Sequence, residues 1–336
     1  MELVSPATLA EMARMAGASV ATTSRDFTGG PGRPAPELLR GLSYLPNAAA
    51  QAAGRGHTNV VGLIVHDIND PYFSSIAAGV TGVADEQDMI VTLADTRRRP
   101  EREAKYLASL RQLRCRAVIL AGSRSADQAS EARLRREIAS FTAGGGRVAM
   151  ISQQLPGVDT VLVENSTGAR DLAHSLFDLG HRSFVVLAGP ASLRTSRDRV
   201  SGFRQGLADR GLRLEPRHVL HADFTREGGF AAAMHWRNSG VKATCLFAAN
   251  DVMAVGAMAA LRQLGLSVPE EISIAGFDDI LPLRDISPAV TTVHIPLETL
   301  GMEAMGLVLA PECGLTPRVR RIRCTVRLRE STRHVP

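Results

Sequence analysis

Residues 60–73 read VVGLIVHDINDPYF, a six-residue apolar run followed at once by polar and aromatic side chains. Seven further apolar runs of four to six residues follow it, and most are separated by segments long enough for a crossover helix. This alternation predicts parallel α/β sheets with right-handed crossovers, and the number of runs fits two lobes. The further runs are residues 89–94, 117–121, 147–152, 160–163, 184–189, 244–249 and 272–277, and the helical segments include 74–87, 102–113, 167–179 and 251–264.

The side chains that directly follow these runs are candidates for one shared site, because ligands of open α/β sheets bind beyond the carboxyl ends of the strands. They combine aromatic rings, amides, carboxylates and a hydroxyl, which suits a polyhydroxylated or heterocyclic small molecule. A role as a helix cap stays open for Asp251, and a structural role is favoured for Asp279. The candidates are His66, Asp67, Tyr72, Phe73, Ser123, Gln153, Gln154, Asn250, Asp251, Asp278 and Asp279.

Residues 8–25, TLAEMARMAGASVATTSR, predict two short helices around a tight turn. Thr8 and Glu11 form a capping box, and the apolar residues at 9, 12, 13 and 16 share one helix face. Gly17 ends this helix, and Ser19 caps a second one from about residue 20 to 27. A helix-turn-helix that reads DNA has this arrangement, and so does an ordinary helical hairpin.

Composition indicates a globular protein, with 45% hydrophobic and 22% charged residues, and 336 residues are enough for a small domain plus a body of two lobes. No run of 18 apolar residues predicts a membrane helix, and the N-terminus does not resemble a signal peptide, so we expect a cytoplasmic protein without a membrane partner. The four cysteines have no C-x-x-C spacing, which favours buried thiols over a metal site or a disulfide framework.

The net charge of +5 is poor support for nucleic-acid binding, because the basic residues gather outside the N-terminal segment. Residues 1–58 carry five arginines against four acids, whereas residues 97–136 carry twelve Lys or Arg against four acids. We interpret the arginines of 97–136 as solvated helix faces. The sequence also lacks a Ser-His-acid arrangement, a G-x-S-x-G motif and a glycine-rich phosphate loop, so we expect neither an enzyme nor a cofactor nor a metal site.

The N-terminal segment resembles the lac repressor/purine repressor (LacI/GalR) family of bacterial transcription regulators, whose pattern is roughly T-[IL]-x-[DE]-[VI]-A-x-x-A-G-V-S-x-x-T-V-S-R. The resemblance continues through residues 44–50 (YLPNAAA) and over nearly the whole chain to residues 329–332 (REST). The matching positions of the first segment are Thr8, Leu9, Glu11, Met12, Ala13, Ala16, Gly17, Ser19, Thr22, Ser24 and Arg25.

This resemblance implies an α/β protein with a small all-α helix-turn-helix domain, followed by a body of the class I periplasmic-binding-protein type with parallel sheets. The implied domains are residues 1–46 for DNA binding, 47–58 for a hinge and 59–336 for effector binding and dimerisation. Within the body, lobe one takes about 59–160 plus 293–316, and lobe two about 161–292 plus 317–332. The implied DNA-binding residues are Thr8, Ser19, Val20, Ala21, Thr22, Ser24, Arg25, Asn47, Ala50 and Ala53.

For the effector site, the resemblance implies that aromatic residues of the segment 67–73 line a pocket and that Arg199 binds the effector. Asn250 and Asp278 would bind hydroxyl groups, and Phe224 would cover the ligand. Replacing Arg199 or Asp278 by alanine is then expected to abolish ligand binding and to leave the fold intact. The implied effector-binding residues are Asp67, Tyr72, Phe73, Ser123, Arg197, Arg199, Phe224, Asn250 and Asp278.

Three features of the DNA-binding end depart from the family pattern. Glu37 and Tyr44 enclose only six residues where the family has about thirteen, which removes about two helical turns from a very small domain. Asp26 stands where the family usually has an apolar residue, and a carboxylate there is repelled by phosphates or must be desolvated. Ala53 stands at the position of the leucine that wedges into the minor groove, and Gly54 weakens the hinge helix.

The sequence therefore predicts a transcription regulator, most simply a repressor, with double-stranded operator DNA, a homodimer partner and a small-molecule effector such as a sugar. Two alternatives stay open. One is a cytoplasmic sugar-binding sensor of the same family with weak or lost DNA binding. The other is a solute-binding protein, for which the body alone fits equally well.

Overall fold

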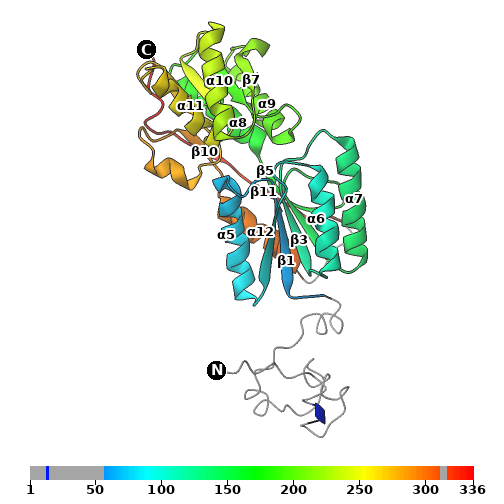
Figure 1. The fold of residues 1–336 in the computed structure, drawn as a ribbon. Coiled ribbons are helices and arrows are strands. Elements are labelled where there is room, and N and C mark those ends of the chain that lie inside the picture. The colour runs from blue at the N-terminus through cyan, green and yellow to red at the C-terminus, as the bar shows by residue number, and fades with distance from the viewer. Residues whose placement is uncertain (1–12, 15–56, 311–315) are drawn as a thin grey trace, which may run out of the picture.

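The computed structural model of the chain describes residues 13–14, 57–310 and 316–336. Residues 57 onward form two α/β lobes, drawn one above the other in Figure 1. The predicted α/β body of two lobes with parallel sheets is confirmed. All the predicted DNA-binding residues lie outside the described part of the chain: Thr8, Ser19, Val20, Ala21, Thr22, Ser24, Arg25, Asn47, Ala50 and Ala53.

Lobe one is a parallel six-stranded sheet between two pairs of helices, with α5 and α12 on one face and α6 and α7 on the other (Figure 1). Along its strand β1, Leu63 packs with the α5/α12 side and Ile64 with the α6/α7 side, because successive strand side chains alternate between faces. The strands in spatial order are β11 (Val319–Ile322), β5 (Asp159–Val163), β4 (Arg147–Ser152), β3 (Ala117–Gly122), β1 (Val60–Val65) and β2 (Ile90–Asp95), and the helices are α5 (Pro71–Glu86), α6 (Glu101–Gln112), α7 (Gln128–Ala143) and α12 (Leu297–Leu309).

Lobe two is a parallel four-stranded sheet, with α8 packed on α9 and α10 packed on α11. Gly202 permits the close approach of α9 to α8, since a Cβ at this position would overlap the carbonyl oxygen of Ser166. The strands in spatial order are β7 (Val219–His221), β6 (Phe184–Ala188), β8 (Cys245–Ala248) and β9 (Ser273–Ala275), and the helices are α8 (Asn165–Asp178), α9 (Arg194–Asp209), η1 (Pro216–His218), α10 (Arg226–Ser239), α11 (Asp251–Gln263) and η2 (Leu281–Asp285).

The chain passes between the lobes three times: after β5, after β10 (Thr292–His294) and after β11, where β12 (Thr325–Arg327) pairs antiparallel with β10. These crossings differ from the predicted lobe boundaries. Residues 161–163 and 319–322 were assigned to lobe two, but they pair with each other in the lobe one sheet. The reason is that β5 continues its pairing with β4 beyond residue 160, and the arginine-rich β11 joins β5 as an edge strand.

The predicted strands at 60–65 and 147–152 have the observed bounds. Each of the other six predicted strands differs from the observed one by one to three residues, counted over both of its ends. Four strands were not predicted: β7, β10, β11 and β12. Within the described ranges, no helix has the length and apolar character needed to cross a bilayer.

Candidate functional site

A pocket lies between the lobes at the carboxyl ends of their parallel strands, where open α/β folds bind ligands. It encloses about 440 Å³ of empty space, solvent at its mouth included, and we call it the interlobe pocket. Lobe one contributes His66, Asp70, Tyr72, Phe73, Arg98, Gly122, Ser123 and Ser152, and lobe two contributes Leu193, Thr195, Arg199, Phe224, Asn250 and Asp278.

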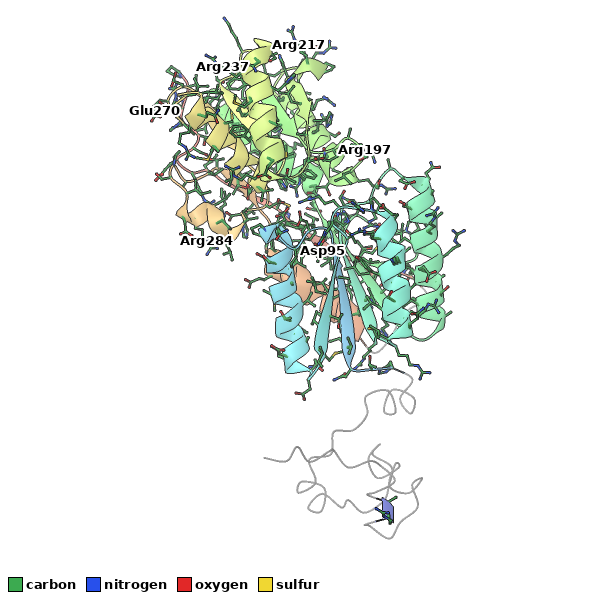
Figure 2. All side chains as sticks on the ribbon, viewed as in Figure 1. Asp95, Arg197, Arg217, Arg237, Glu270 and Arg284 are labelled. Carbon is green, nitrogen blue, oxygen red and sulfur yellow. The ribbon has the colours of Figure 1, made fainter. Side chains whose placement is uncertain are left out.

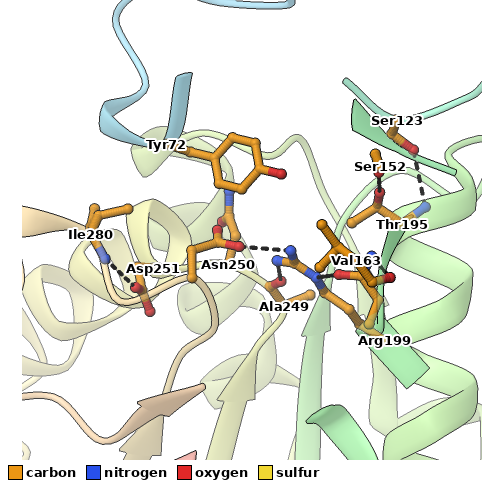
Figure 3. Close-up of polar contacts among 12 residues, drawn as sticks. Tyr72, Ser123, Ser152, Val163, Thr195, Arg199, Ala249, Asn250, Asp251 and Ile280 are labelled. Atoms are coloured by element: carbon orange, nitrogen blue, oxygen red, sulfur yellow. Dashed lines mark hydrogen bonds and ion pairs between the residues drawn. The ribbon is translucent and has the colours of Figure 1, made fainter. Parts of the chain in front are cut away.

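Arg199 is the best-anchored side chain of the pocket, and it is almost fully buried. Its guanidinium donates to Asn165 Oδ1 at 2.8 Å, to the Ala249 carbonyl at 2.7 Å and to Asp278 Oδ1 at 2.6 Å (Figure 3). Its guanidinium carbon also lies 3.9 Å from the centre of the Phe277 ring, a cation–π distance. These contacts fix the Arg199 plane before any ligand arrives.

Burial controls the charge of the carboxyl group that faces Arg199. It raises the pKa of Asp278 to about 8, although Arg199 opposes the rise. Burial also raises the pKa of the Tyr72 hydroxyl, with Asp278 adding to the effect across the cleft. Tyr72 therefore stays a neutral hydroxyl, and it lies close enough to Asp278 and Arg199 of the opposite lobe to interact with their charges.

Asp278 also has an unusual backbone, with φ of 120°. Ser152, at the end of β4, has φ of 122°, and the next residue after Asp278, Asp279, has φ of 58°. Non-glycine residues rarely adopt such angles, and they cluster where function requires a particular side-chain direction. Ser152 and Asp278 both line the interlobe pocket, which marks these strand ends as built for a ligand.

On the lobe one side, Asp70 caps α5 by accepting from the Tyr72 backbone N–H at 3.1 Å. Arg98, which follows β2, donates to Asp70 Oδ2 and to Asp67 Oδ2, both at 3.2 Å. Asp67 is thus held at the back of Arg98 and does not line the pocket. Two acids face this one cation, so Arg98 orients the α5 N-terminus without giving the pocket a net positive charge.

Behind the pocket lies a buried triad of His66, Glu103 and Arg124. Glu103 on α6 accepts from Arg124 through both carboxylate oxygens, one at 2.7 Å, and its Oε1 lies 3.1 Å from His66 Nε2. Burial alone would raise the pKa of Glu103, but Arg124 and His66 lower it to about 2. Glu103 is therefore a carboxylate at neutral pH.

Two short segments join the lobes directly beside the pocket, residues 123–126 of lobe one and 192–195 of lobe two, which we call the interlobe bridge. Ala126 N donates to the Ser192 carbonyl at 2.8 Å, and Arg194 N donates to the Arg124 carbonyl at 2.9 Å. These two bonds form an antiparallel bridge between residues 125 and 193.

Side chains reinforce the interlobe bridge at Thr195 (Figure 3). Its backbone N–H donates to Ser123 Oγ at 3.0 Å, and its hydroxyl accepts from Gln153 Nε2 at 2.7 Å and lies 3.3 Å from Ser152 Oγ. The structure therefore holds the two lobes in contact beside the interlobe pocket.

Seven of the nine residues predicted to bind effector line the interlobe pocket. The two others do not: Asp67 pairs with Arg98, and Arg197 is exposed on the outside of α9 (Figure 2). The seven are Tyr72, Phe73, Ser123, Arg199, Phe224, Asn250 and Asp278.

The remaining candidates have structural contacts. The cap of α11 is Asn250, not Asp251, and Asn250 Oδ1 accepts from Met253 N at 3.1 Å. Asp251 is buried and accepts from Ile280 N and from the Thr292 hydroxyl. Asp279 binds Arg329 and His294, as the structural interpretation requires.

The interpretation of 97–136 as solvated arginine faces was wrong for Arg98 and Arg124. Arg98 lines the pocket, and Arg124 is 3% exposed because it pairs with the buried Glu103. Neither was detectable from spacing, since each partner lies 21 or more residues away. Thr195 and Leu193 were also missed, whereas Ser152 ends a predicted strand and could have been included by the rule that selected Ser123.

The pocket offers aromatic faces, hydroxyls, an amide and one buried Arg–Asp pair, and its other arginine, Arg98, is paired with Asp67 and Asp70. Such a lining suits a neutral polyhydroxylated molecule, whose hydroxyls both donate and accept. In the described residues, no three His, Cys, Asp or Glu side chains are grouped so that they could hold a metal ion.

Comparison with known proteins agrees with this geometry. Residues 173–332 match the family described as the periplasmic binding protein-like domain. The HTH-type transcriptional regulator GalR of Escherichia coli K12 is 31% identical over 312 residues, covering 90% of this chain and 89% of GalR.

Two solved structures extend the comparison. A LacI family transcriptional regulator from Enterococcus faecium with bound ribose is 25% identical, with a TM-score of 0.70 over 82% of this chain and 100% of that chain. The transcriptional regulator CelR in complex with cellobiose is 25% identical, with a TM-score of 0.72 over 97% of this chain and 99% of that chain.

Proposed function

The chain belongs to the LacI/GalR family of transcription regulators, and from this we propose that it is a repressor whose affinity for operator DNA is controlled by a sugar bound in the interlobe pocket. The regulator acts in the cytoplasm, where its operator is. The related regulators are not enzymes, and family membership leaves a transport protein without support.

The observation that carries the sugar assignment is the composition of the interlobe pocket. Arg199 and Asp278 form a fixed donor–acceptor pair, and Tyr72 and Phe224 add aromatic surface. Donor–acceptor pairs beside aromatic faces recognise the hydroxyls and the C–H face of a sugar ring. Related structures hold ribose and cellobiose, which supports a carbohydrate ligand for this chain.

We assign DNA binding to residues 1–46 and the hinge to residues 47–58, with residues 59–336 as the effector-binding and dimerisation body. In a homodimer, two reading heads would meet a pseudo-palindromic operator, with the helix at 20–27 in the major groove. Val20 and Ala21 would make apolar base contacts, Arg25 a phosphate or base contact, and Ala53 the weak minor-groove contact.

The sugar would act by changing how the lobes close, and the interlobe bridge is the contact between the lobes that this closure would alter. Closure changes the spacing of the two hinge segments in the dimer and so their ability to order on the operator. The coupling is reciprocal: if the sugar weakens operator binding by some factor, the operator weakens sugar binding by that factor.

The second candidate is a sugar sensor with weak or lost DNA binding. The six residues between Glu37 and Tyr44, and Ala53 in the hinge, favour it, since both reduce the stability or grip of the reading head. This sensor would have the same interlobe pocket as the repressor and would differ from it only in DNA binding.

One set of experiments on the full chain separates these candidates. A thermal-shift screen with D-ribose, D-galactose, D-glucose, D-fructose and cellobiose tests the pocket, and we expect at least one sugar to raise the melting temperature. Selection from random duplex DNA at low salt tests the reading head, because phosphate contacts are strongest there. Enrichment of a pseudo-palindrome supports the repressor. A sugar-induced shift of the melting temperature without any enriched DNA sequence supports the sensor. If no sugar shifts the melting temperature and no DNA sequence is enriched, both candidates are refuted.

A further inference from the structure

His66 lies between two cavities. It lines the interlobe pocket, and it also lines a smaller cavity of about 270 Å³ together with Glu103, Ser123 and Arg124. The residue is 7% exposed, and it directly follows β1, so its backbone is fixed by the sheet. A buried imidazole at a pocket wall is a hydrogen-bonding group whose direction depends on which ring nitrogen carries the proton.

Glu103 determines that proton position. As a carboxylate held by Arg124, it can only accept hydrogen bonds. The His66 Nε2 atom lies 3.1 Å from Glu103 Oε1, so Nε2 must carry the hydrogen and donate it. Arg124 already balances the charge of Glu103, so a ring that donates its single hydrogen through Nε2 leaves Nδ1 as an acceptor.

The packing of His66 is tight on one side and open on the other. Gly122, at the end of β3, has φ of 150°, and a Cβ there would overlap the imidazole ring. The Phe73 ring lies 5.9 Å away, between centroids. Among the described residues, Nδ1 has no hydrogen-bond partner, so the acceptor is held in place and unused.

We propose that His66 is a specificity-determining residue of the interlobe pocket, whose Nδ1 accepts a hydrogen bond from one hydroxyl of the bound sugar. This rests on the proposed function, in which the pocket binds a sugar. Glu103 and Arg124 are positioning residues, which act by keeping the hydrogen on Nε2. The pocket then discriminates against any sugar that lacks a hydroxyl at this position, because a buried acceptor would stay unpaired.

Two matched substitutions separate the two ring nitrogens. Glutamine places its amide N–H near the position of Nε2, so His66→Gln keeps the donor to Glu103 and removes the acceptor. Asparagine places its carbonyl near the position of Nδ1, so His66→Asn keeps the acceptor and removes the donor. His174→Gln, on the surface of α8, is the control for the substitution itself.

The first measurement is calorimetric titration of the full chain with the five sugars named above and with monodeoxy derivatives of each sugar that binds. We expect His66→Gln to weaken binding about tenfold, His66→Asn to weaken it less because its carbonyl keeps the acceptor, and His174→Gln to change it by less than about threefold. One deoxy position should cost the wild type about tenfold and His66→Gln almost nothing. Equal deoxy penalties in the wild type and in His66→Gln overturn the proposal.

The second measurement needs no ligand. Long-range proton–nitrogen spectra of the ¹⁵N-histidine-labelled protein report the tautomer of each ring, and His66 is assigned by the signal that disappears in His66→Gln. The Nε2–H form supports the proposal, and the Nδ1–H form overturns it. If no sugar of the panel binds the wild type, the sugar assignment fails by itself, and this spectrum still decides the orientation of His66.

Discussion

Replacing Arg199 by methionine removes the cation at the centre of the interlobe pocket with little change in side-chain volume. Three buried acceptors lose their donor: Asn165 Oδ1, the Ala249 carbonyl and Asp278 Oδ1. An unpaired buried acceptor costs about 1–3 kcal/mol, so the three together cost about 3–9 kcal/mol, and we expect a loss of about 4 kcal/mol. The pKa of Asp278, already raised to about 8, lets this group take up a proton and keeps the loss near the low end.

Urea unfolding at pH 7, followed by fluorescence, measures this loss directly. Trp236 is the single tryptophan of the chain and is buried in lobe two, the lobe that holds Arg199. With a slope of about 2 kcal/mol per molar urea, the midpoint should fall by about 2 M. Arg197→Met, on the exposed side of the same helix, is the control and should stay within about 0.5 kcal/mol of the wild type.

A double substitution tests the cause. Adding Asp278→Asn to Arg199→Met removes the cost of protonating the unpaired carboxyl group on folding, and we expect it to restore part of the lost stability, since removing both partners of a buried pair is often nearly neutral. A loss below about 1 kcal/mol for Arg199→Met would refute the reasoning. The structure thus changes one expectation from the sequence: substitutions at this pair affect the fold as well as the ligand.

Gly122→Ala should lower sugar affinity and should lower the free energy of unfolding by roughly 1–3 kcal/mol, because the new Cβ meets the His66 ring. Gly157→Ala is the control for the backbone strain alone, since Gly157 has φ of 87° and open space around its Cβ position. Equal losses of stability in the two variants would contradict the clash with His66. Thr195→Val should loosen the interlobe bridge and increase the radius of gyration in X-ray scattering without sugar; an unchanged radius contradicts this. Burial lowers the pKa of His181 to about 4, so its unfolded form binds the proton more readily, and stability should fall as pH decreases from about 6.5 to 4. His181→Gln should flatten that part of a denaturation-midpoint curve, and an unchanged slope would exclude His181 as the cause.

Most of the parallel body was predictable because its central strands are continuous apolar runs and most of them are followed by a helix. The strand β1 is buried on both faces, so its sequence VVGLIV shows no polar position. The edge strand β11 reads VRRI, and its arginines point to solvent or to surface acids such as Glu303. Edge pairing of this kind depends on the tertiary neighbour β5, and local sequence carries little signal for it.

The candidate site was predictable where it follows strands, and not where it depends on distant pairs. Tyr72, Ser123 and Asp278 come within a few residues of apolar runs, so the rule for open α/β sheets selects them. Arg98 enters the pocket from a loop after an edge strand, and Glu103 meets Arg124 only when α6 packs beside β3. Such pairs are decided by the packing of whole elements, which spacing along the chain does not encode.

The interlobe bridge has a consequence for how such a sensor changes over time. Its two central bonds join main-chain groups, so they do not depend on which side chain, proline apart, occupies residues 126 and 194. Substitutions at Phe224, Asn250 or Tyr72 can therefore exchange one sugar for another while the closing contact stays the same. Substitutions in the pocket can therefore change which ligand binds without changing the contact that closes the lobes, which makes this body a good starting point for biosensors with new specificities.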